Sequence, residues 1–108
     1  MEVLWWGGCP SYPDALRELR RLMAEEGLDP DGVELREVES DEQAVRERFP
    51  GSPTIRIDGD DVVPPGQGER WSLTCRVYRR RDGAISPLPD PADVQAGLRA
   101  ALAARTRT

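Results

Sequence analysis

A short apolar run that ends in two glycines and a cysteine is the feature that most constrains the fold. Residues 3 to 6 read Val-Leu-Trp-Trp, and Gly7-Gly8 ends the run. Such a continuous β-prone run is typical of a strand buried on both faces in a parallel pairing. From Tyr12 onward the apolar residues recur at helical spacing. The chain is therefore predicted to begin with a strand, a turn that holds Cys9, and a helix.

The rest of the chain continues in short elements. Ser40 followed by Gln43 is a capping-box signature for a second helix, and Asp90 followed by Pro91 begins a third. The predicted elements after the first helix, which Gly27 ends, are a strand over 33–38, a helix from Ser40 to Phe49, a strand over 54–57, a loop over 59–72, a strand over 73–78 and a helix from Pro91. The order β-α-β-α-β-β-α indicates one α/β domain over 1–105, with a frayed tail over 106–108.

Alternation predicts which side chains of the two last strands face the core. In 54–57 one face is expected to be buried. In 73–78 the set Leu73, Cys75 and Val77 is expected to face the core, and Thr74, Arg76 and Tyr78 the other side.

Composition excludes several classes of function. The net charge is −5, with arginines mostly interleaved with glutamates, so nucleic acid is not expected as a partner. Arg79-Arg80-Arg81 ends at Asp82-Gly83 and is interpreted as a solvated hairpin tip. No apolar run approaches the ~20 residues of a membrane span, and the N-terminus lacks the pattern of a secretory signal. We expect a cytoplasmic protein without a membrane partner.

Cys9 is the residue to which the sequence assigns chemistry. It follows a buried strand and precedes a helix, where unpaired N–H groups and the helix dipole favour a thiolate. Pro10 suits the first helical turn, and the two glycines let the backbone bend while leaving the sulfur uncovered. An accessible, acidic thiol is the expectation.

The segment Trp6-Gly7-Gly8-Cys9-Pro10-Ser11-Tyr12, followed later by Gly51-Ser52-Pro53-Thr54, resembles the thioredoxin superfamily over nearly the whole chain. The resemblance implies a three-layer domain with a four-stranded mixed sheet flanked by helices. It also implies that Pro53 is cis and faces the sulfur of Cys9, and that Ser52 offers its backbone groups to a docking partner.

The sequence departs from the dithiol members of that family at Tyr12, which stands where they carry a second cysteine. A monothiol needs an external thiol or a second cysteine within reach to release its partner. Cys75 is the only internal candidate. If the strands over 54–57 and 73–78 pair antiparallel, Cys75 lies at the far end of the sheet, beyond the ~7 Å Cα separation of a disulfide. A small buried residue is the main interpretation of Cys75, and a resolving or metal-sharing role is the alternative.

The tryptophans, the absence of histidine and the absence of a second Gly-Gly turn indicate what surrounds Cys9. Trp5 is predicted to lie in the core and Trp6 beside the site, whereas Trp71 either folds over the site or anchors its loop. The chain has no histidine, which excludes a Cys-His pair and the zinc sets that need imidazole. No metal site and no cofactor are predicted. The Gly-Gly turn of glutaredoxins is replaced by residues 79–83, so glutathione binding is not predicted.

Three functions remain open. The first is thiol-disulfide chemistry through Cys9, with a protein or a small-molecule thiol or disulfide as partner. The second is capture of a soft metal or organomercurial by the thiolate. The third is a non-catalytic interaction module that uses the loop over 59–72. A monomer or a weak homodimer is expected in each case.

Overall fold

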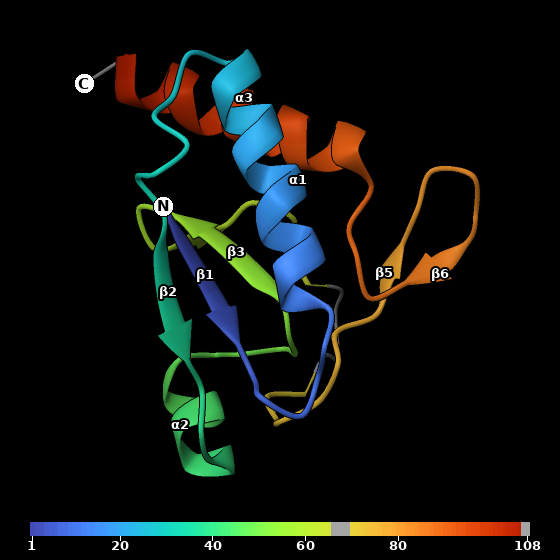
Figure 1. The fold of residues 1–108 in the computed structure, drawn as a ribbon. Helices are drawn as coiled ribbons and strands as arrows, with labels where there is room; N and C mark the ends of the chain where they lie inside the picture. The colour runs from blue at the N-terminus through green and yellow to red at the C-terminus, as the bar shows by residue number, and fades with distance from the viewer. Residues whose placement is uncertain (66–69, 107–108) are drawn as a thin grey trace.

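A four-stranded mixed sheet of order β2-β1-β3-β4 forms the centre of the computed structural model (Figure 1). The structure describes residues 1–65 and 70–106. The described elements are β1 (Glu2–Trp5), α1 (Tyr12–Glu25), β2 (Glu34–Glu37), α2 (Asp41–Arg46), β3 (Thr54–Ile57), β4 (Asp60–Asp61), β5 (Tyr78–Arg79), β6 (Ile85–Ser86) and α3 (Pro91–Thr106). The chain is thus a mixed α/β protein.

The pairing of β1 with both neighbours makes the sheet mixed. β1 runs parallel to β2, with Val3 opposite Leu35, and α1 is the crossover between them. On its other edge β1 runs antiparallel to β3, with Val3 opposite Ile55. The predicted βαβ unit at the start of the chain is therefore confirmed.

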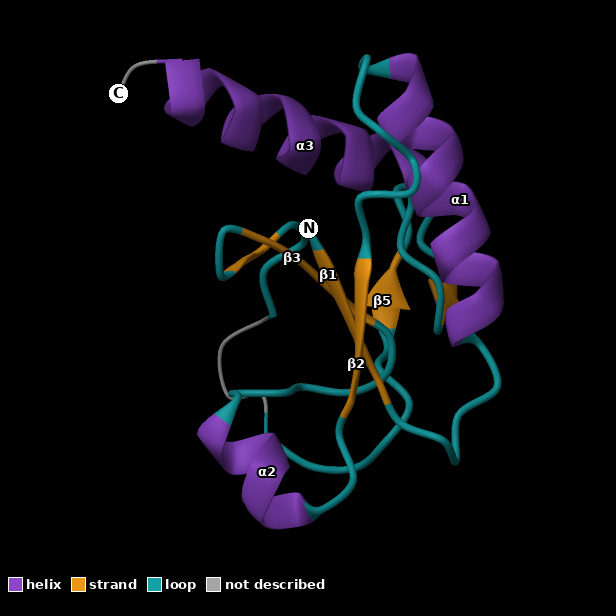
Figure 2. Cartoon of the chain, turned by 60° about the vertical axis from the view of Figure 1, so that its left-hand side comes forward, coloured by secondary structure: helices purple, strands orange, loops and turns teal. Residues whose placement is uncertain are grey.

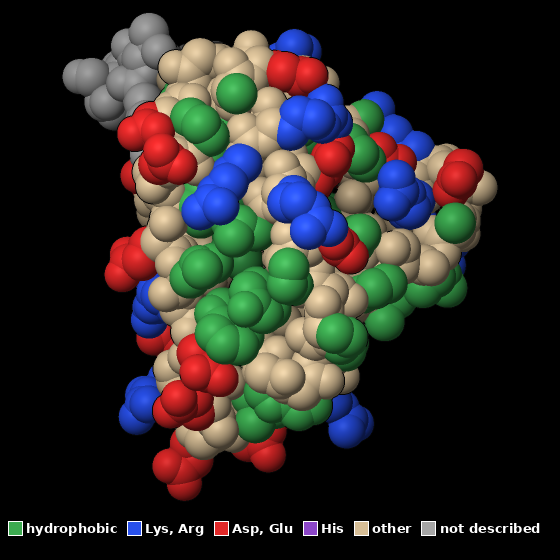
Figure 3. Space-filling model, in the orientation of Figure 1, with side chains coloured by type: hydrophobic (Ala, Val, Ile, Leu, Met, Phe, Trp, Pro, Cys, Tyr) green, Lys and Arg blue, Asp and Glu red, His purple; other side chains and the backbone are tan. Residues whose placement is uncertain are grey.

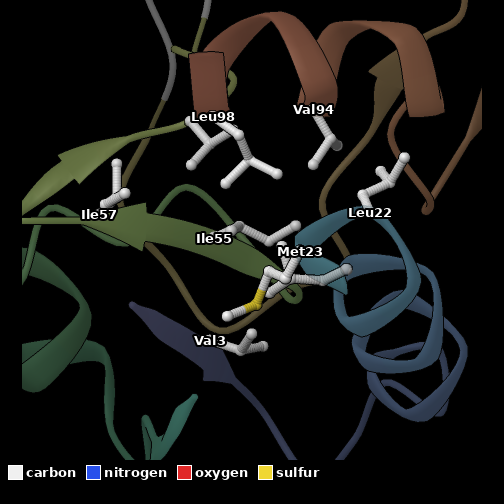
Figure 4. Packing of buried hydrophobic residues seen from close by; sticks show 9 residues of the cluster. Val3, Leu22, Met23, Ile55, Ile57, Val94 and Leu98 are labelled. Atoms are coloured by element: carbon white, nitrogen blue, oxygen red, sulfur yellow. The ribbon is translucent and has the colours of Figure 1, made fainter. Parts of the chain in front are cut away.

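Both faces of the sheet are covered. α1 and α3 cross on one side of the sheet, and α2 lies beyond the end of β2, where Ala44 joins the apolar cluster of the other face (Figure 2). The first face carries the larger cluster of buried apolar side chains, drawn in Figure 4, which consists of Val3, Leu19, Leu22, Met23, Ile55, Ile57, Val62, Val94 and Leu98. The second face carries Leu4, Val38, Ala44 and Phe49. Alternation along β1 sends Val3 to one cluster and Leu4 to the other.

β3 differs from its prediction because both of its faces are buried. All four residues from Thr54 to Ile57 are buried, including Arg56, which is 8% exposed. The Arg56 guanidinium is tolerated there because Nε donates to Asp61 Oδ1 at 2.7 Å and Nη2 donates to the Arg48 carbonyl at 2.9 Å. Alternation predicted that this second face of β3 is exposed to solvent. In the structure it carries Arg56, which is buried and paired.

The fourth strand of the sheet is not the predicted one. β4, at Asp60–Asp61, pairs with β3 and lies inside the stretch predicted as a loop over 59–72. The predicted strand over 73–78 is reduced to an isolated bridge at Cys75 and to Tyr78, the first residue of β5. Within the predicted loop, residues 66–69 lie outside the described residues.

Most helix boundaries follow the predicted signals, although α2 ends at Arg46, short of the predicted Phe49. α1 ends before Gly27, which has φ +77°, and the Ser40 hydroxyl accepts from the Gln43 N–H at 3.1 Å at the start of α2. α3 begins at Pro91 after Asp90, whose Oδ1 accepts from the Ala92 N–H at 3.0 Å. Of the predicted tail, Thr106 belongs to α3 and 107–108 lie outside the described residues. None of the described helices is long and apolar enough to cross a membrane.

The arginine triplet lies where it was predicted. β5 and β6 form a hairpin whose turn contains Arg81 and Asp82. Arg81 Nε pairs with Asp93 at 2.9 Å, and its backbone N–H donates to Asp90. That hydrogen bond and the one from Ala92 lower the pKa of Asp90. Charged side chains of both signs are interleaved over α1 in Figure 3, in keeping with ion pairs such as Arg21–Glu25.

Candidate functional site

Cys9 follows β1 through a tight turn. Its backbone N–H donates to the Trp6 carbonyl at 3.1 Å, which closes a turn across Gly7-Gly8. The indole of Trp6 lies directly over Gly8, where a Cβ would overlap the ring. Trp6 also packs against the second apolar cluster, so it joins the Cys9 turn to the core. The predicted place of Trp6 beside Cys9 agrees with this arrangement.

α1 begins at Tyr12, where the helical spacing of apolar residues was predicted to begin, but its first turn does not include Pro10. Ser11 is the N-cap residue, and Pro13, not Pro10, occupies the first helical turn. Pro10 therefore lies in the turn ahead of the helix. The Tyr12 ring stacks on Trp5, with ring centroids 4.4 Å apart. The prediction that Pro10 lies in the first helical turn is wrong, because Pro10 and Ser11 form a turn between Cys9 and α1.

Cys9 and Cys75 form a disulfide, with their Cα atoms 5.5 Å apart. The prediction that a direct bridge is out of reach is wrong. It assumed that Cys75 lies on a strand antiparallel to β3. Instead, Cys75 forms a parallel bridge with Ser52, just before β3, and this pairing brings it to the end of the sheet where Cys9 lies. The site is therefore a two-cysteine site.

The exposure of the two cysteines is the reverse of the prediction. Cys9 is 1% exposed, whereas Cys75 belongs to the exposed residues. The same reversal extends from Cys75 to Tyr78, because Arg76 and Tyr78 are buried and Val77 is 64% exposed. Leu73 packs against the second apolar cluster and Thr74 is exposed, both as predicted. Alternation gives two sets of side chains but does not say which set faces the core, and a shift of one residue exchanges them.

Ser52 holds the Cys75 segment through its backbone. The Ser52 N–H donates to the Thr74 carbonyl, and the Ser52 carbonyl accepts from the Arg76 N–H, each at 2.8 Å. The Ser52–Pro53 peptide bond is cis, as the resemblance implied. The same resemblance implied that the backbone groups of Ser52 bind a docking partner. This implication is wrong for the structure described, because the N–H and the carbonyl of Ser52 are already bonded to the chain's own segment. Cys9 Sγ lies 3.6 Å from the Ser52 carbonyl oxygen.

Gly51 allows the two backbones to come this close. A Cβ at Gly51 would lie 2.7 Å from both Cα and N of Arg76, and the Gly51 φ is +142°. Both conditions require glycine. The Gly51 carbonyl accepts from the Thr54 hydroxyl at 2.7 Å, which ties the start of β3 to the same turn. The predicted group Ser52, Pro53 and Thr54 is thus buried and fixed in place.

Arg76 and Tyr78 anchor the segment beyond Cys75. The Arg76 guanidinium lies 4.3 Å from the centre of the Tyr78 ring and donates through Nη2 to the Val63 carbonyl. The Tyr78 hydroxyl donates to the Pro53 carbonyl at 2.6 Å. Sequence reasoning missed these anchors, although an arginine and a tyrosine alternating in one apolar stretch was a usable signal. Burial raises the pKa of Tyr78 to about 12.

The raised pKa of Tyr78 predicts a loss of stability at high pH. The folded protein favours the protonated phenol, so this contribution to the free energy of unfolding is complete below pH ~10 and is lost as the pH rises through ~12. Tyr12→Phe leaves Tyr78 as the remaining tyrosine of two, and its tyrosinate absorbance reports the titration. Tyr78 should titrate near pH 12, together with unfolding monitored by circular dichroism. Ionisation near pH 10 in a fully folded protein would contradict the burial.

Two hollows of the described surface lie away from the sulfurs. One of about 430 Å³ lies between α1 and the start of α3 and is lined by residues such as Leu19, Leu88 and Val94. Trp71 lines another of about 300 Å³ with Arg48 and Pro65. Neither cysteine lines these hollows. Among the described residues there is no group of three or more side chains suited to hold a metal ion.

Comparison with known proteins gives no match: a scan against protein-family models, a search of curated proteins and a search of solved structures each found none. The distinctive chemical feature of the chain is a disulfide between a buried Cys9 and an exposed Cys75, held beside Ser52–Pro53.

Proposed function

We propose that the chain performs thiol-disulfide exchange through Cys9 and Cys75, as a thioredoxin-like protein whose second cysteine lies outside the first-helix motif. The observation that carries the proposal is the Cys9–Cys75 disulfide next to the Ser52–Pro53 bond. The single-thiol hypothesis needed an external thiol to release a bound partner. A second cysteine within bonding distance removes that need.

The exchange balances as a two-electron cycle. In the dithiol form, the thiolate of one cysteine attacks a client disulfide, forms a mixed disulfide and releases one client thiol. The other cysteine then attacks that mixed disulfide, so the Cys9–Cys75 bond forms and the second client thiol leaves. Two equivalents of an external thiol restore the dithiol and leave as their own disulfide. The client is reduced by two electrons, which the external thiol supplies.

The exposure of Cys75 supports a reactive disulfide and not a structural one. Exposed disulfides are generally the labile, regulatory or catalytic ones, whereas structural disulfides resist reduction. Cys75 is exposed on a surface segment. The sequence also predicts a cytoplasmic location, where disulfides are usually transient and catalytic or redox-sensing.

The proposal is tested by turnover. The protein is added in catalytic amounts to a disulfide-bonded peptide with dithiothreitol as reductant, and the release of peptide thiol is followed. The wild type should accelerate reduction, and Cys9→Ser and Cys75→Ser should each lose most of that acceleration. Val77→Ala, a change at an exposed neighbour of Cys75, is the matched control and should retain the wild-type rate. Assays are run at a temperature at which circular dichroism shows every variant to be folded.

A rate in the double variant Cys9→Ser/Cys75→Ser equal to that of the wild type would overturn the proposal. Absence of acceleration by a folded wild type would do the same and would favour the interaction-module hypothesis. Capture of a soft metal or mercurial is distinguished by its dependence on redox state, because the disulfide leaves neither sulfur as a free thiolate. That activity would be confined to the reduced protein and would need no turnover.

A further inference from the structure

We infer that the external thiol that reduces this protein attacks Cys75, so that Cys75 is the entry point of exchange and Cys9 is the buried leaving group. The inference rests on the proposed function, of which it specifies the order of events. It reverses the roles that the motif around Cys9 suggests. Three observations carry it: the burial of Cys9, the exposure of Cys75 and the occupation of Ser52.

Burial closes the route to Cys9. A thiolate must approach a disulfide sulfur nearly opposite the sulfur that leaves, so the attacked atom needs open space on that side. Cys9 is 1% exposed over the whole residue, and its sulfur lies 3.6 Å from the Ser52 carbonyl oxygen. The backbone beside it is tied by the 3.1 Å hydrogen bond from the Cys9 N–H to Trp6. An incoming thiol has no path to this sulfur without prior opening.

The hydrogen bonds that Ser52 already makes prevent a second approach to Cys9, along the Ser52 backbone. An extended client segment that paired with Ser52 would approach Cys9 from that side. Both backbone groups of Ser52 are already bonded, to Thr74 and to Arg76, and Gly51 lies directly against the Arg76 backbone. A client would have to displace the chain's own segment first. In the oxidised protein the disulfide holds that segment in place.

Exposure opens the route to Cys75. Thr74, Cys75 and Val77 are all exposed, so the segment presents its cysteine at the surface. Attack there joins the sulfur of the external thiol to Cys75 Sγ and breaks the bond to Cys9 Sγ. Cys9 leaves as a thiolate and takes a proton from solvent. A second external thiolate then attacks the external sulfur of the adduct, frees Cys75 and leaves as an external disulfide.

The anchors keep the adduct close to Cys9. Tyr78 remains hydrogen-bonded to Pro53 and Arg76 remains stacked on Tyr78 when the disulfide opens, because none of these contacts involves a sulfur. Cys75 therefore stays near Cys9, and the Cys9 thiolate reverses the first step readily. We expect the adduct on Cys75 to be short-lived in the wild type and persistent in Cys9→Ser.

Glutathione is used as the probe thiol. The oxidised wild type is mixed with excess glutathione, quenched in acid at successive times and digested with pepsin at low pH, and the adduct is located by mass spectrometry. The adduct is expected on the peptide that holds Cys75. An adduct predominantly on the Cys9 peptide would overturn the inference.

Single-cysteine variants decide the case in which no wild-type adduct accumulates. Cys9→Ser and Cys75→Ser are each treated with glutathione disulfide in the folded state and in urea, and the ratio of the two rates measures the protection by the fold. Cys75 in Cys9→Ser should react at close to its unfolded rate, and Cys9 in Cys75→Ser should be slowed by about tenfold or more, because access limits exchange. Equal protection, or greater protection of Cys75, would overturn the inference.

The two proposals fail separately. Peptide turnover with an adduct on Cys9 would support the proposed function and reject the entry point at Cys75. An adduct on Cys75 without peptide turnover would support the entry point and reject catalysis.

Discussion

Reduction of the Cys9–Cys75 disulfide should lower the free energy of unfolding by about 4 kcal/mol, because the bond closes a loop whose ends are 66 residues apart. The bond restricts the unfolded chain far more than the folded one, in which backbone pairing already holds Cys75 beside Ser52. For a domain of this size the loss corresponds to a fall in the melting temperature on the order of 15 °C. Urea unfolding of the oxidised and the fully reduced wild type measures it.

The matched control for this prediction is Cys75→Ser, which removes the bond at an exposed position. It should be destabilised by a similar amount and should show no further change when reductant is added. Cys9→Ser should be less stable still, because it places a hydroxyl at a site that is 1% exposed. Equal stability of oxidised and reduced wild type would contradict the pairing of the two cysteines.

Gly51→Ala should destabilise the protein by roughly 3 kcal/mol or more, through backbone strain and steric overlap together. The Gly51 φ of +142° is open to glycine and strained for alanine, and the new Cβ would lie 2.7 Å from the Arg76 backbone. The overlap should push residues 74–76 away from Ser52. Slower formation of the Cys9–Cys75 bond after reduction is therefore expected in addition to the loss of stability.

Gly27→Ala separates the two causes. Gly27 also has a positive φ, of +77°, but no atom lies within 4 Å of its added Cβ. Its cost should stay at about 1–2 kcal/mol, the backbone penalty alone, without an effect on disulfide formation. Both are measured by urea unfolding and by the rate of reoxidation in a glutathione buffer. Equal effects of the two substitutions would show that Gly51 and Arg76 are not in contact.

Much of the fold could be predicted from local signals. The run ended by Gly7-Gly8, the capping pair Ser40 and Gln43, and Asp90-Pro91 before α3 each act within a few residues, and each marks an element of the structure. The parallel pairing of β1 and β2 also followed, because a helix between two strands leaves few other connections.

The fourth strand could not be predicted in the same way. Asp60–Asp61 is too short and too polar to signal a strand, and it pairs because it follows β3 closely. Residues 73–78 alternate well, yet the pairing of Cys75 with Ser52 depends on a contact distant in sequence. Alternation also does not determine which face of residues 73–78 is buried. In the structure Arg76 stacks on Tyr78, and both side chains are buried. These are tertiary contacts, which local propensity does not encode.

The candidate site could likewise be predicted where local motifs mark it and not where it depends on contacts distant in sequence. Cys9 and Pro53 could be identified because each lies in a local motif, and the cis bond at Pro53 agrees with the resemblance. The role of Cys75 depended on a distance across the fold, which the assumed antiparallel pairing made too long. The burial of Cys9 could not be predicted either, because its partner Cys75 is held in place by Ser52 and Gly51, which are distant from Cys9 in sequence.

The most direct test of the central claim is a redox titration of the wild type in glutathione buffers, with acid quench, alkylation and mass spectrometry of the cysteine peptides. If Cys9 and Cys75 form an exchangeable pair, both should pass together from alkylated thiols to one linked peptide in a single two-electron transition. The claim would be contradicted if both cysteines remained alkylated in the most oxidising buffer, or if each carried glutathione separately without a peptide that links Cys9 to Cys75.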